Sequence, residues 1–188
     1  MSRLERLVAA VRPGIELRAL AVHDDEAVLA GGQEVFRLPL APSAAVRHAV
    51  LVQALPALRT ALPVAVAVPR YIGVMADGTT PFTAEPLLPG TVPLALSSIA
   101  TGQLAGALAA LAAVSTRQAQ QWGVLGASHG AAGTSGASVL LHGDLRRSAL
   151  LADPSSGLLT GIVGWRLRFG AADEDLASLE PELRLGLT

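Results

Sequence analysis

The chain has 188 residues, of which 51% are apolar and only 3% aromatic, so it can form one domain or two small lobes around an aliphatic core. Its 14 basic and 15 acidic residues give a net charge of −1, which offers no basic excess for nucleic acid and no polybasic anchor for a membrane. Lys, Asn and Cys are absent. Without Cys there can be no disulfide or cysteine-ligated zinc, which suits the reducing cytoplasm that we expect as its location.

The first half of the chain predicts a mostly antiparallel sheet with helices. Ser2 and Glu5 form a capping box, which opens a helix over Arg3–Val11. Gly31-Gly32 is a tight turn between two apolar strands and favours a β-hairpin. Ser43 caps a helix over 44–55, which we expect Pro56 to end. The expected strands are 15–22, 26–30, 33–38, 64–68, 71–75 and 81–87.

The second half predicts helices around a short hairpin. No residue is charged between Pro86 and Thr116, but Pro and polar residues interrupt this stretch, so we expect a buried helix over 96–114 and no membrane span. Its spacing places four side chains near one face: Ile99, Leu104, Leu108 and Leu111. Beyond it we expect a Gly/Ala/Ser-rich loop over 128–138, two strands around a turn at 153–157, and a helix over 173–179.

The segment Leu141–Trp165 (LHGDLRRSALLADPSSGLLTGIVGW) carries the clearest motif, beginning with His142-Gly143-Asp144. It resembles the catalytic core of the aminoglycoside phosphotransferase family, which is related to the protein kinases. In that family the Asp of the His-Gly-Asp loop accepts the proton of the substrate hydroxyl, and a downstream Asn and Asp hold the metal. The resemblance implies Asp144 as the base and puts Ala149 and Gly164 at the two metal positions.

Three shorter segments extend the resemblance. Residues 35–39 are similar to the family's strand whose basic residue, here Arg37, contacts the nucleotide phosphates. Residues 87–90 resemble the hinge between the two lobes. Asp175 stands where the family's Asp-Leu-Ala helix begins. The resemblance implies an α+β, protein-kinase-like two-lobe fold, with a mostly antiparallel small lobe over 1–88 and a shortened helical large lobe over 89–188. Two departures accompany it: the helix 44–55 has no acid to orient Arg37, and we expect a C-terminal truncation, because the chain ends soon after Asp175.

Several candidate residues have two interpretations. Asp144 is either the catalytic base or a structural carboxylate that bonds loop amides. His142 belongs behind the loop as a packing residue, together with Gly143 and Trp165. Arg37 either clamps phosphate or is an exposed strand residue.

Other charged groups leave similar alternatives open. Arg146-Arg147 could bind an anion, replace lost metal charge or be solvated. The run 23–26 predicts a solvated turn, and the acids at 173–175 favour a helix N-terminus over a substitute metal site. His48 and His129 have no partner that the sequence identifies.

Three functions are compatible with these features. The first is a pseudoenzyme that binds a partner or ligand without transferring phosphate, and needs no cofactor. The second is an active ATP-dependent small-molecule phosphotransferase, with Asp144 as base and with ATP and Mg²⁺ bound. The third is a non-functional truncated remnant. Because few residues follow Asp175 to cover the long helix, we expect a homodimer or a protein partner through the large lobe.

Overall fold

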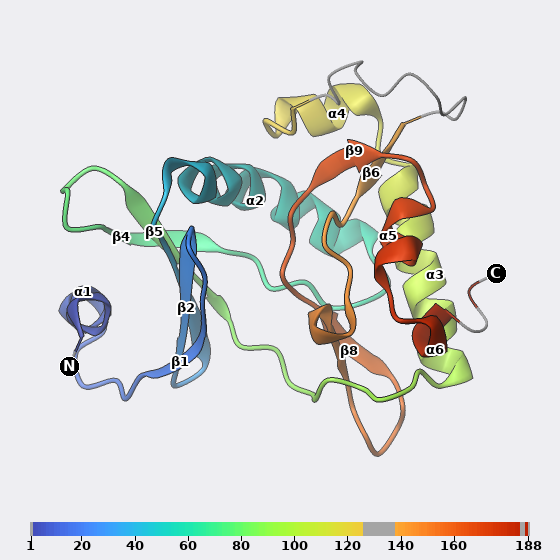
Figure 1. Cartoon of the computed structure of the whole chain (residues 1–188), viewed down its shortest axis with the longest axis horizontal. Helices are drawn as coiled ribbons and strands as arrows, with labels where there is room; N and C mark the ends of the chain where they lie inside the picture. Colours follow the sequence, from blue (N-terminus) through green and yellow to red (C-terminus); the bar gives the residue numbers. More distant parts are fainter. Residues whose placement is uncertain (1, 126–137, 185–186, 188) are drawn as a thin grey trace. The chain divides into compact units, whose positions relative to one another are not determined.

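The computed structural model describes residues 2–125, 138–184 and 187 (Figure 1). The chain divides into two compact units. The first comprises Met1–Val52 and Val68–Leu87, and the second comprises Gln53–Ala67 and Leu88–Thr188. The second unit thus includes residues 53–67, which lie within the range 1–88 that we predicted as the small lobe.

The first unit is built on a five-stranded antiparallel sheet with strand order β1-β2-β3-β5-β4. Its strands are β1 (Arg18–Val22), β2 (Glu26–Gly31), β3 (Glu34–Pro39), β4 (Arg70–Val74) and β5 (Pro81–Pro86). The predicted hairpin is present: β2 and β3 pair in register, and Gly32 takes the positive φ of 56° that the turn requires.

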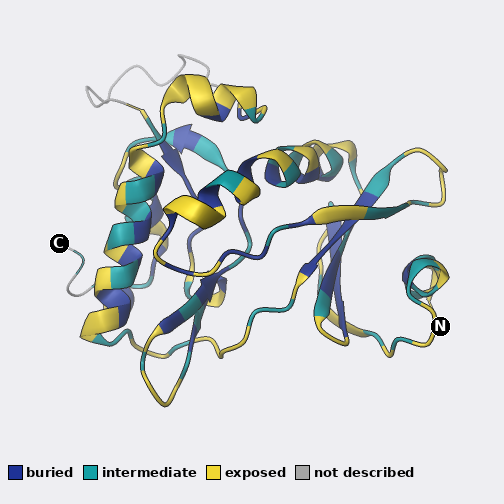
Figure 2. Ribbon diagram, turned by 180° about the vertical axis from the view of Figure 1, so that it is seen from behind, coloured by how far each residue is buried: buried dark blue, intermediate teal, exposed yellow. Residues whose placement is uncertain are grey.

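The core of the first unit lies between one face of this sheet and helix α1 (Arg3–Val11). The expected capping box begins α1, since Ser2 and Glu5 each bond the other's backbone amide. Val8 of α1 is fully buried against Phe36 and Phe82 of the sheet. Figure 2 shows β2 buried along its length, in keeping with its place inside the sheet.

Helix α2 (Pro42–Ala61) runs beyond its expected end, and the strand predicted after it is absent. The predicted end before Pro56 is wrong because the helix continues through this residue, with Leu55 and Leu58 buried on either side of it. Burial of these neighbours outweighs the one backbone hydrogen bond that a proline cannot make. Residues 64–68 form no strand; Val66 makes only an isolated bridge to Ile162.

The second unit contains short helices and two small sheets. Its helices are α3 (Ser98–Ala112), α4 (Thr116–Gln121), the 3-10 turn η1 (Arg147–Ala149), α5 (Glu174–Ser178) and α6 (Pro181–Arg184). Its strand pairs are β6 (Val139–Leu141) with β9 (Arg168–Gly170), and β7 (Leu150–Ala152) with β8 (Leu159–Ile162). Helix α3 packs against β6 and β8.

The apolar face predicted for α3 is only partly buried. Leu104 and Leu111 lie in the core and Leu108 is half-buried, but Ile99 is 56% exposed. The expectation that Ile99 shares a face with the other three is wrong in its burial: in the first turn of α3 the buried residues are Ala100 and Thr101. No helix in the described part of the chain has both the length and the apolarity needed to cross a membrane.

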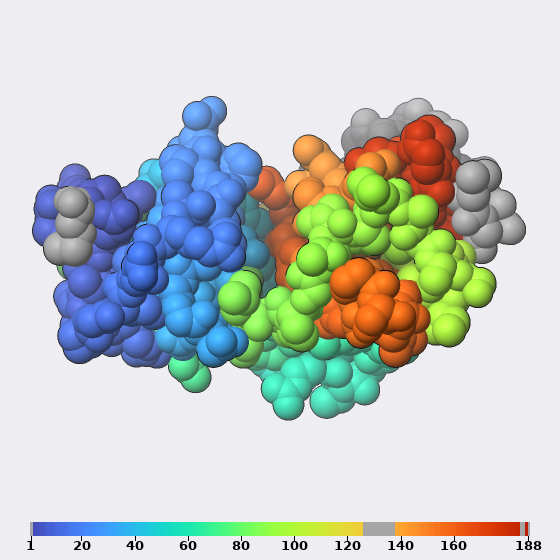
Figure 3. Space-filling model, turned by 90° about the horizontal axis from the view of Figure 1, so that it is seen from below, coloured from blue at the N-terminus to red at the C-terminus, as the bar shows by residue number. Residues whose placement is uncertain are grey.

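The β7–β8 hairpin lies beside the segment that precedes α3 (Figure 3). Thr91 bridges to Ala152, and the Ser97 hydroxyl donates to the carbonyl of Gly157 at 2.6 Å. The loop predicted over 128–138 lies outside the described residues except for Ser138, and so does His129.

Candidate functional site

The His-Gly-Asp loop follows β6 and is held by a buried carboxylate of α5. The amides of His142 and Gly143 donate to the two carboxylate oxygens of Asp175, at 2.7 and 2.9 Å. Asp175 is 1% exposed, and its charge-assisted bond from His142 is buried while that from Gly143 is part-buried. One of the two interpretations of Asp144 was a carboxylate that bonds loop amides, but the amides of His142 and Gly143 bond Asp175 instead. Asp175 therefore does more than the expected anion at a helix N-terminus.

His142 lies behind the loop as a buried, neutral side chain. Its Nδ1 accepts the amide of Asp144 at 3.3 Å, so its Nε2 carries the proton and donates to the carbonyl of Val163 at 3.0 Å. Burial lowers the pKa of His142 despite the nearby charge of Asp175. The imidazole lies 4.5 Å from the ring of Trp165, whose indole N–H bonds the carbonyl of Ile162.

The glycine of the motif is required by close backbone contact. Gly143 has a φ of 92°, and a Cβ at this position would lie 2.3 Å from the carbonyl oxygen of Arg166. Any side chain here would push the loop away from the segment that follows Trp165.

The carboxylate of Asp144 is ion-paired on both oxygens. Nε of Arg146 lies 2.6 Å from one oxygen and Nε of Arg166 lies 3.4 Å from the other. The Asp144 side chain is 28% exposed and the two arginines are more so, so water screens these pairs. Arg147, by contrast, faces Glu180 and Glu182, at 3.7 and 3.6 Å. The two neighbouring arginines of the loop thus pair with different carboxylates, Arg146 with Asp144 and Arg147 with the glutamates near the C-terminus.

The two predicted metal positions carry no ligand atoms. Ala149 is a buried methyl in η1, and Gly164 has no side chain. Asp144 is the one motif residue left here that could ligate, and Mg²⁺ needs several oxygen ligands in near-octahedral geometry. Throughout the described residues, no three His, Asp or Glu side chains are grouped so that they could hold a metal ion. The donor set does not fit a divalent cation.

In the first unit, Arg37 is enclosed by carboxylates from the two strands that flank it. Its Nε donates to Glu85 of β5 at 2.9 Å, and its Nη1 donates to Glu26 of β2 at 3.3 Å. All three residues share one face of the sheet, because Glu26 lies opposite Pro39 and Glu85 lies opposite Val35, each two residues from Arg37. The Arg37 side chain is 15% exposed, so its interpretation as an exposed strand residue is wrong.

Glu26 is buried and also contacts two side chains of α2, so it is not part of a solvated turn as predicted. His48 Nε2 lies 2.5 Å from Glu26 Oε1, and Arg47 lies 3.9 Å from the same oxygen and pairs with Asp25 at 3.1 Å. The His48 ring is 1% exposed, and its Nδ1 has no hydrogen-bond partner among the described residues. The partner that the sequence did not identify for His48 is therefore Glu26, from a strand distant in sequence.

Burial acts on both carboxylates around Arg37, with different outcomes. Burial alone would raise the pKa of Glu26, but the hydrogen bond with His48 and the charge of Arg37 outweigh it and lower this pKa from 4.5 to about 2. At Glu85, burial prevails over the charge of Arg37 and raises the pKa. One guanidinium is thus shared by two carboxylates. The surroundings favour the ionised form of Glu26 and disfavour that of Glu85.

Comparison with known proteins identifies the fold. No protein-family profile and no curated protein sequence matches the chain. Among solved structures it is similar to the GDP complex of aminoglycoside 2'-phosphotransferase-IIIa, with a TM-score of 0.79 and 20% identity over 93% of this chain and 76% of that one.

It is also similar to the apoenzyme of a macrolide 2'-phosphotransferase from Brachybacterium faecium, with a TM-score of 0.71 and 23% identity over 97% and 80% of the two chains. A complex of an aminoglycoside phosphotransferase with streptomycin and ATP gives a TM-score of 0.68 and 14% identity over 92% and 74%. At these identities the likeness establishes the fold, which is the α+β kinase-like fold of these phosphotransferases.

Proposed function

We propose that this protein is a pseudoenzyme with the kinase-like phosphotransferase fold, which binds a partner or ligand without transferring phosphate from ATP. The observation that carries this proposal is the combination of an intact His-Gly-Asp loop with two metal positions, Ala149 and Gly164, that have no ligand atoms. In this chemistry the metal bridges and neutralises the phosphates, and positions the transferred group. A site that lacks those ligands cannot hold the metal that would stabilise the charge of the transferred phosphoryl group.

The surroundings of Arg37 support the same proposal. A basic residue that contacts nucleotide phosphates must offer net positive charge to them. Here the guanidinium of Arg37 already pairs with two carboxylates, those of Glu26 and Glu85. A phosphate group that approached Arg37 would have to compete with both of them.

The alternative, an active small-molecule phosphotransferase, has one observation in its favour. Arg146 and Arg166 bring two positive charges to Asp144, and both lie within three residues in sequence of a position that lacks a metal ligand. Arginine can stabilise charge on a transferred phosphoryl group. The same ion pairs, however, occupy both oxygens of the carboxylate that would have to accept the proton of a substrate hydroxyl.

Isothermal titration of ATP, with and without Mg²⁺, tests the proposal. For the native protein we expect no gain in ATP affinity from Mg²⁺. The matched variant is the double substitution Ala149→Asn and Gly164→Asp, which restores both ligand types. A Cβ at Gly164 meets no atom within 4 Å, and Asp tolerates a positive φ better than most residues, so this half of the restoration is compatible with the fold.

We expect the double variant, and not the native chain, to bind ATP more tightly when Mg²⁺ is present. A Mg²⁺-dependent gain in the native chain would contradict the proposal. So would transfer of labelled γ-phosphate to an aminoglycoside or macrolide that Asp144→Asn abolishes, and this result would establish the alternative. Thermal unfolding of each variant serves as the folding control, because Asn at the buried position 149 adds a polar group to the core.

A further inference from the structure

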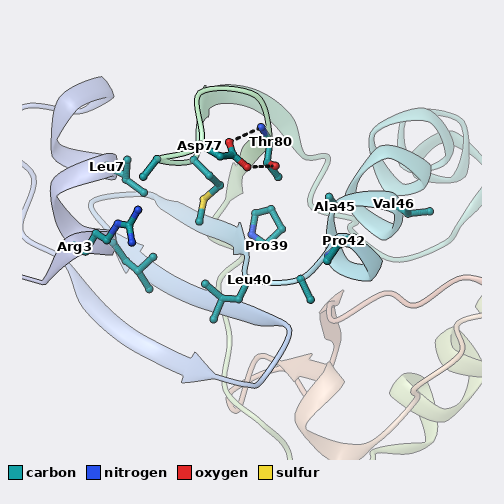
Figure 4. A pocket seen from close by; sticks show the side chains of 13 residues that line it. Arg3, Leu7, Pro39, Leu40, Pro42, Ala45, Val46, Asp77 and Thr80 are labelled. Carbon is teal, nitrogen blue, oxygen red and sulfur yellow. Dashed lines mark hydrogen bonds between the residues drawn. The ribbon is translucent and has the colours of Figure 1, made fainter.

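The first unit has an apolar groove away from the residues discussed above (Figure 4). Its volume is about 590 Å³, and it is lined by α1, the end of β3, the start of α2 and the β4–β5 turn. Figure 4 shows side chains of α1 on one side and of α2 on the other, with Pro39 and Leu40 between them. Apart from Arg3, Asp77 and Thr80, every residue that lines the groove is apolar.

Apolar side chains in this groove are left in contact with water. Leu40 is 42% exposed and Val46 is 59% exposed, while Met75 and Leu7 are half-buried beside them. A ligand that covers these groups would remove apolar surface from water, at about 25 cal/mol per Å². The volume lies within the usual range for small-molecule sites, about 300–1,000 Å³.

The two charged residues of the groove differ in what they can offer a ligand. The Asp77 carboxylate accepts hydrogen bonds from the amides of Thr79 and Thr80 and from the Thr80 hydroxyl, which lower its pKa to about 2. It is therefore ionised and already satisfied within its own turn. The side chain of Arg3 makes no hydrogen bond or ion pair with any residue that the structure describes. The groove thus presents one uncommitted cation beside an apolar floor.

We infer that this groove binds a small amphipathic monocarboxylate, with its aliphatic tail on the apolar floor and its carboxylate against the guanidinium of Arg3. Guanidinium and carboxylate match in a bidentate geometry, and the apolar floor matches an alkyl chain. The fixed negative charge of Asp77 disfavours polyanions such as nucleoside triphosphates. This inference is independent of the proposed function, since it concerns another site and is tested without ATP.

Decanoate, below its micelle concentration, is a suitable probe for titration calorimetry with the full chain. The matched ligand is decanol, which has the same tail and no charge. We expect decanoate to bind at least tenfold more tightly than decanol. Arg3→Gln should remove this preference, whereas Arg18→Gln, which changes an exposed arginine outside the groove, should leave it intact. Val46→Glu should weaken both ligands, and its exposure makes it compatible with folding.

Three results would overturn the inference. The first is equal affinity for decanoate and decanol. The second is a decanoate affinity that survives both Arg3→Gln and Val46→Glu. The third is tighter binding of an apolar helical peptide with an amidated end, unaffected by Arg3→Gln, which would assign the groove to a protein partner instead. Unchanged melting curves of the variants confirm that their folds are retained.

Discussion

The two aspartates of the candidate site differ in what their carboxylates hold. Asp175 accepts one buried and one part-buried amide, whereas Asp144 pairs with two solvent-exposed arginines. A buried hydrogen bond to a charged group contributes about 1.5–3 kcal/mol, and its loss leaves an amide unsatisfied. Exposed ion pairs contribute about 1 kcal/mol or less. The residue that stabilises the loop is therefore Asp175. The carboxylate of Asp144 contributes little to holding the loop in place.

We predict that Asp175→Ala lowers the free energy of unfolding by about 3 kcal/mol or more, because both loop amides lose their acceptor. Asp144→Ala should lower it by about 1 kcal/mol or less. Urea unfolding followed by circular dichroism measures both variants against the native chain. Equal losses in the two variants would show that Asp144 also anchors the loop, contrary to the hydrogen bonds of the structure.

Among the elements, β3 carries a buried charge network that makes stability depend on pH. The folded-state pKa of Glu26 is lowered to about 2. Its contribution to the free energy of unfolding is therefore present above pH 4.5 and is lost as the pH falls toward 2. A shift of this size corresponds to about 3 kcal/mol at neutral pH. The pKa of Glu85 is raised, so its contribution is present at acid pH and is lost as the pH rises through the folded-state value.

We therefore predict unequal losses of stability from the two charge-removing substitutions. Glu26→Gln should reduce stability by about 3 kcal/mol at pH 7 and flatten the decline below pH 4.5. Glu85→Gln should lower the free energy of unfolding much less at pH 7. It removes a carboxylate whose charge is disfavoured by burial, and it leaves Arg37 paired with Glu26. Urea unfolding at pH 7, 5 and 3 distinguishes them. A larger loss for Glu85→Gln than for Glu26→Gln at pH 7 would refute this assignment.

Local signals predicted the elements that local chemistry controls. The capping box of α1, the glycine turn between β2 and β3, and the hairpin around the 153–157 turn are each defined by residues close in sequence. The environment of Arg37 depends on Glu85, which is 48 residues away, and no pattern in the chain indicates that pairing. The helix through Pro56 was missed for a related reason, since burial on both sides of the proline is a tertiary effect.

Pro56 gives a direct test of that account of α2. Its side chain is exposed and it lies inside the helix, so Pro56→Ala should restore a backbone hydrogen bond without disturbing the core. We predict a gain of about 2 kcal/mol in unfolding free energy. Pro42→Ala, at the first position of the same helix, should give no gain, because proline is favoured there. A loss on Pro56→Ala would show that the proline fixes a bend the fold needs.

At the scale of the whole molecule, fold and function were predictable to different degrees. An ungapped motif block from Leu141 to Trp165, with weaker matches in the same order, was enough to predict the kinase-like fold, and the solved structures confirm it at 14–23% identity. The resemblance puts the metal positions of the family at Ala149 and Gly164, whose side chains offer no ligand atom. The groove beside Arg3 was not predictable, because it combines side chains from three segments that are separate in sequence.

The second unit leaves apolar side chains exposed where the chain enters α3. Leu94 is 83% exposed, Ile99 is 56% exposed and Leu158 is 40% exposed. The hydrogen bond from Ser97 to Gly157 brings the sequence neighbours of these residues together. Contiguous exposed apolar surface usually marks an interface, and a specific contact buries about 800 Å² on each partner. This surface is where we expect the large-lobe contact that the sequence led us to predict.

We predict that the chain forms a homodimer through this surface, or fails to remain soluble at high concentration without another protein that covers it. Ile99→Glu should shift the dimer toward monomer, because it places a charge in the contact. Val22→Glu, which changes an apolar residue of the first unit that is 65% exposed, should leave the dimer unchanged. Sedimentation velocity between about 1 and 100 μM gives both comparisons, a range chosen to bracket micromolar dissociation constants. A native chain that stays a soluble monomer at the highest concentration would contradict the prediction, and the three side chains would then be ordinary exposed residues of a monomeric surface.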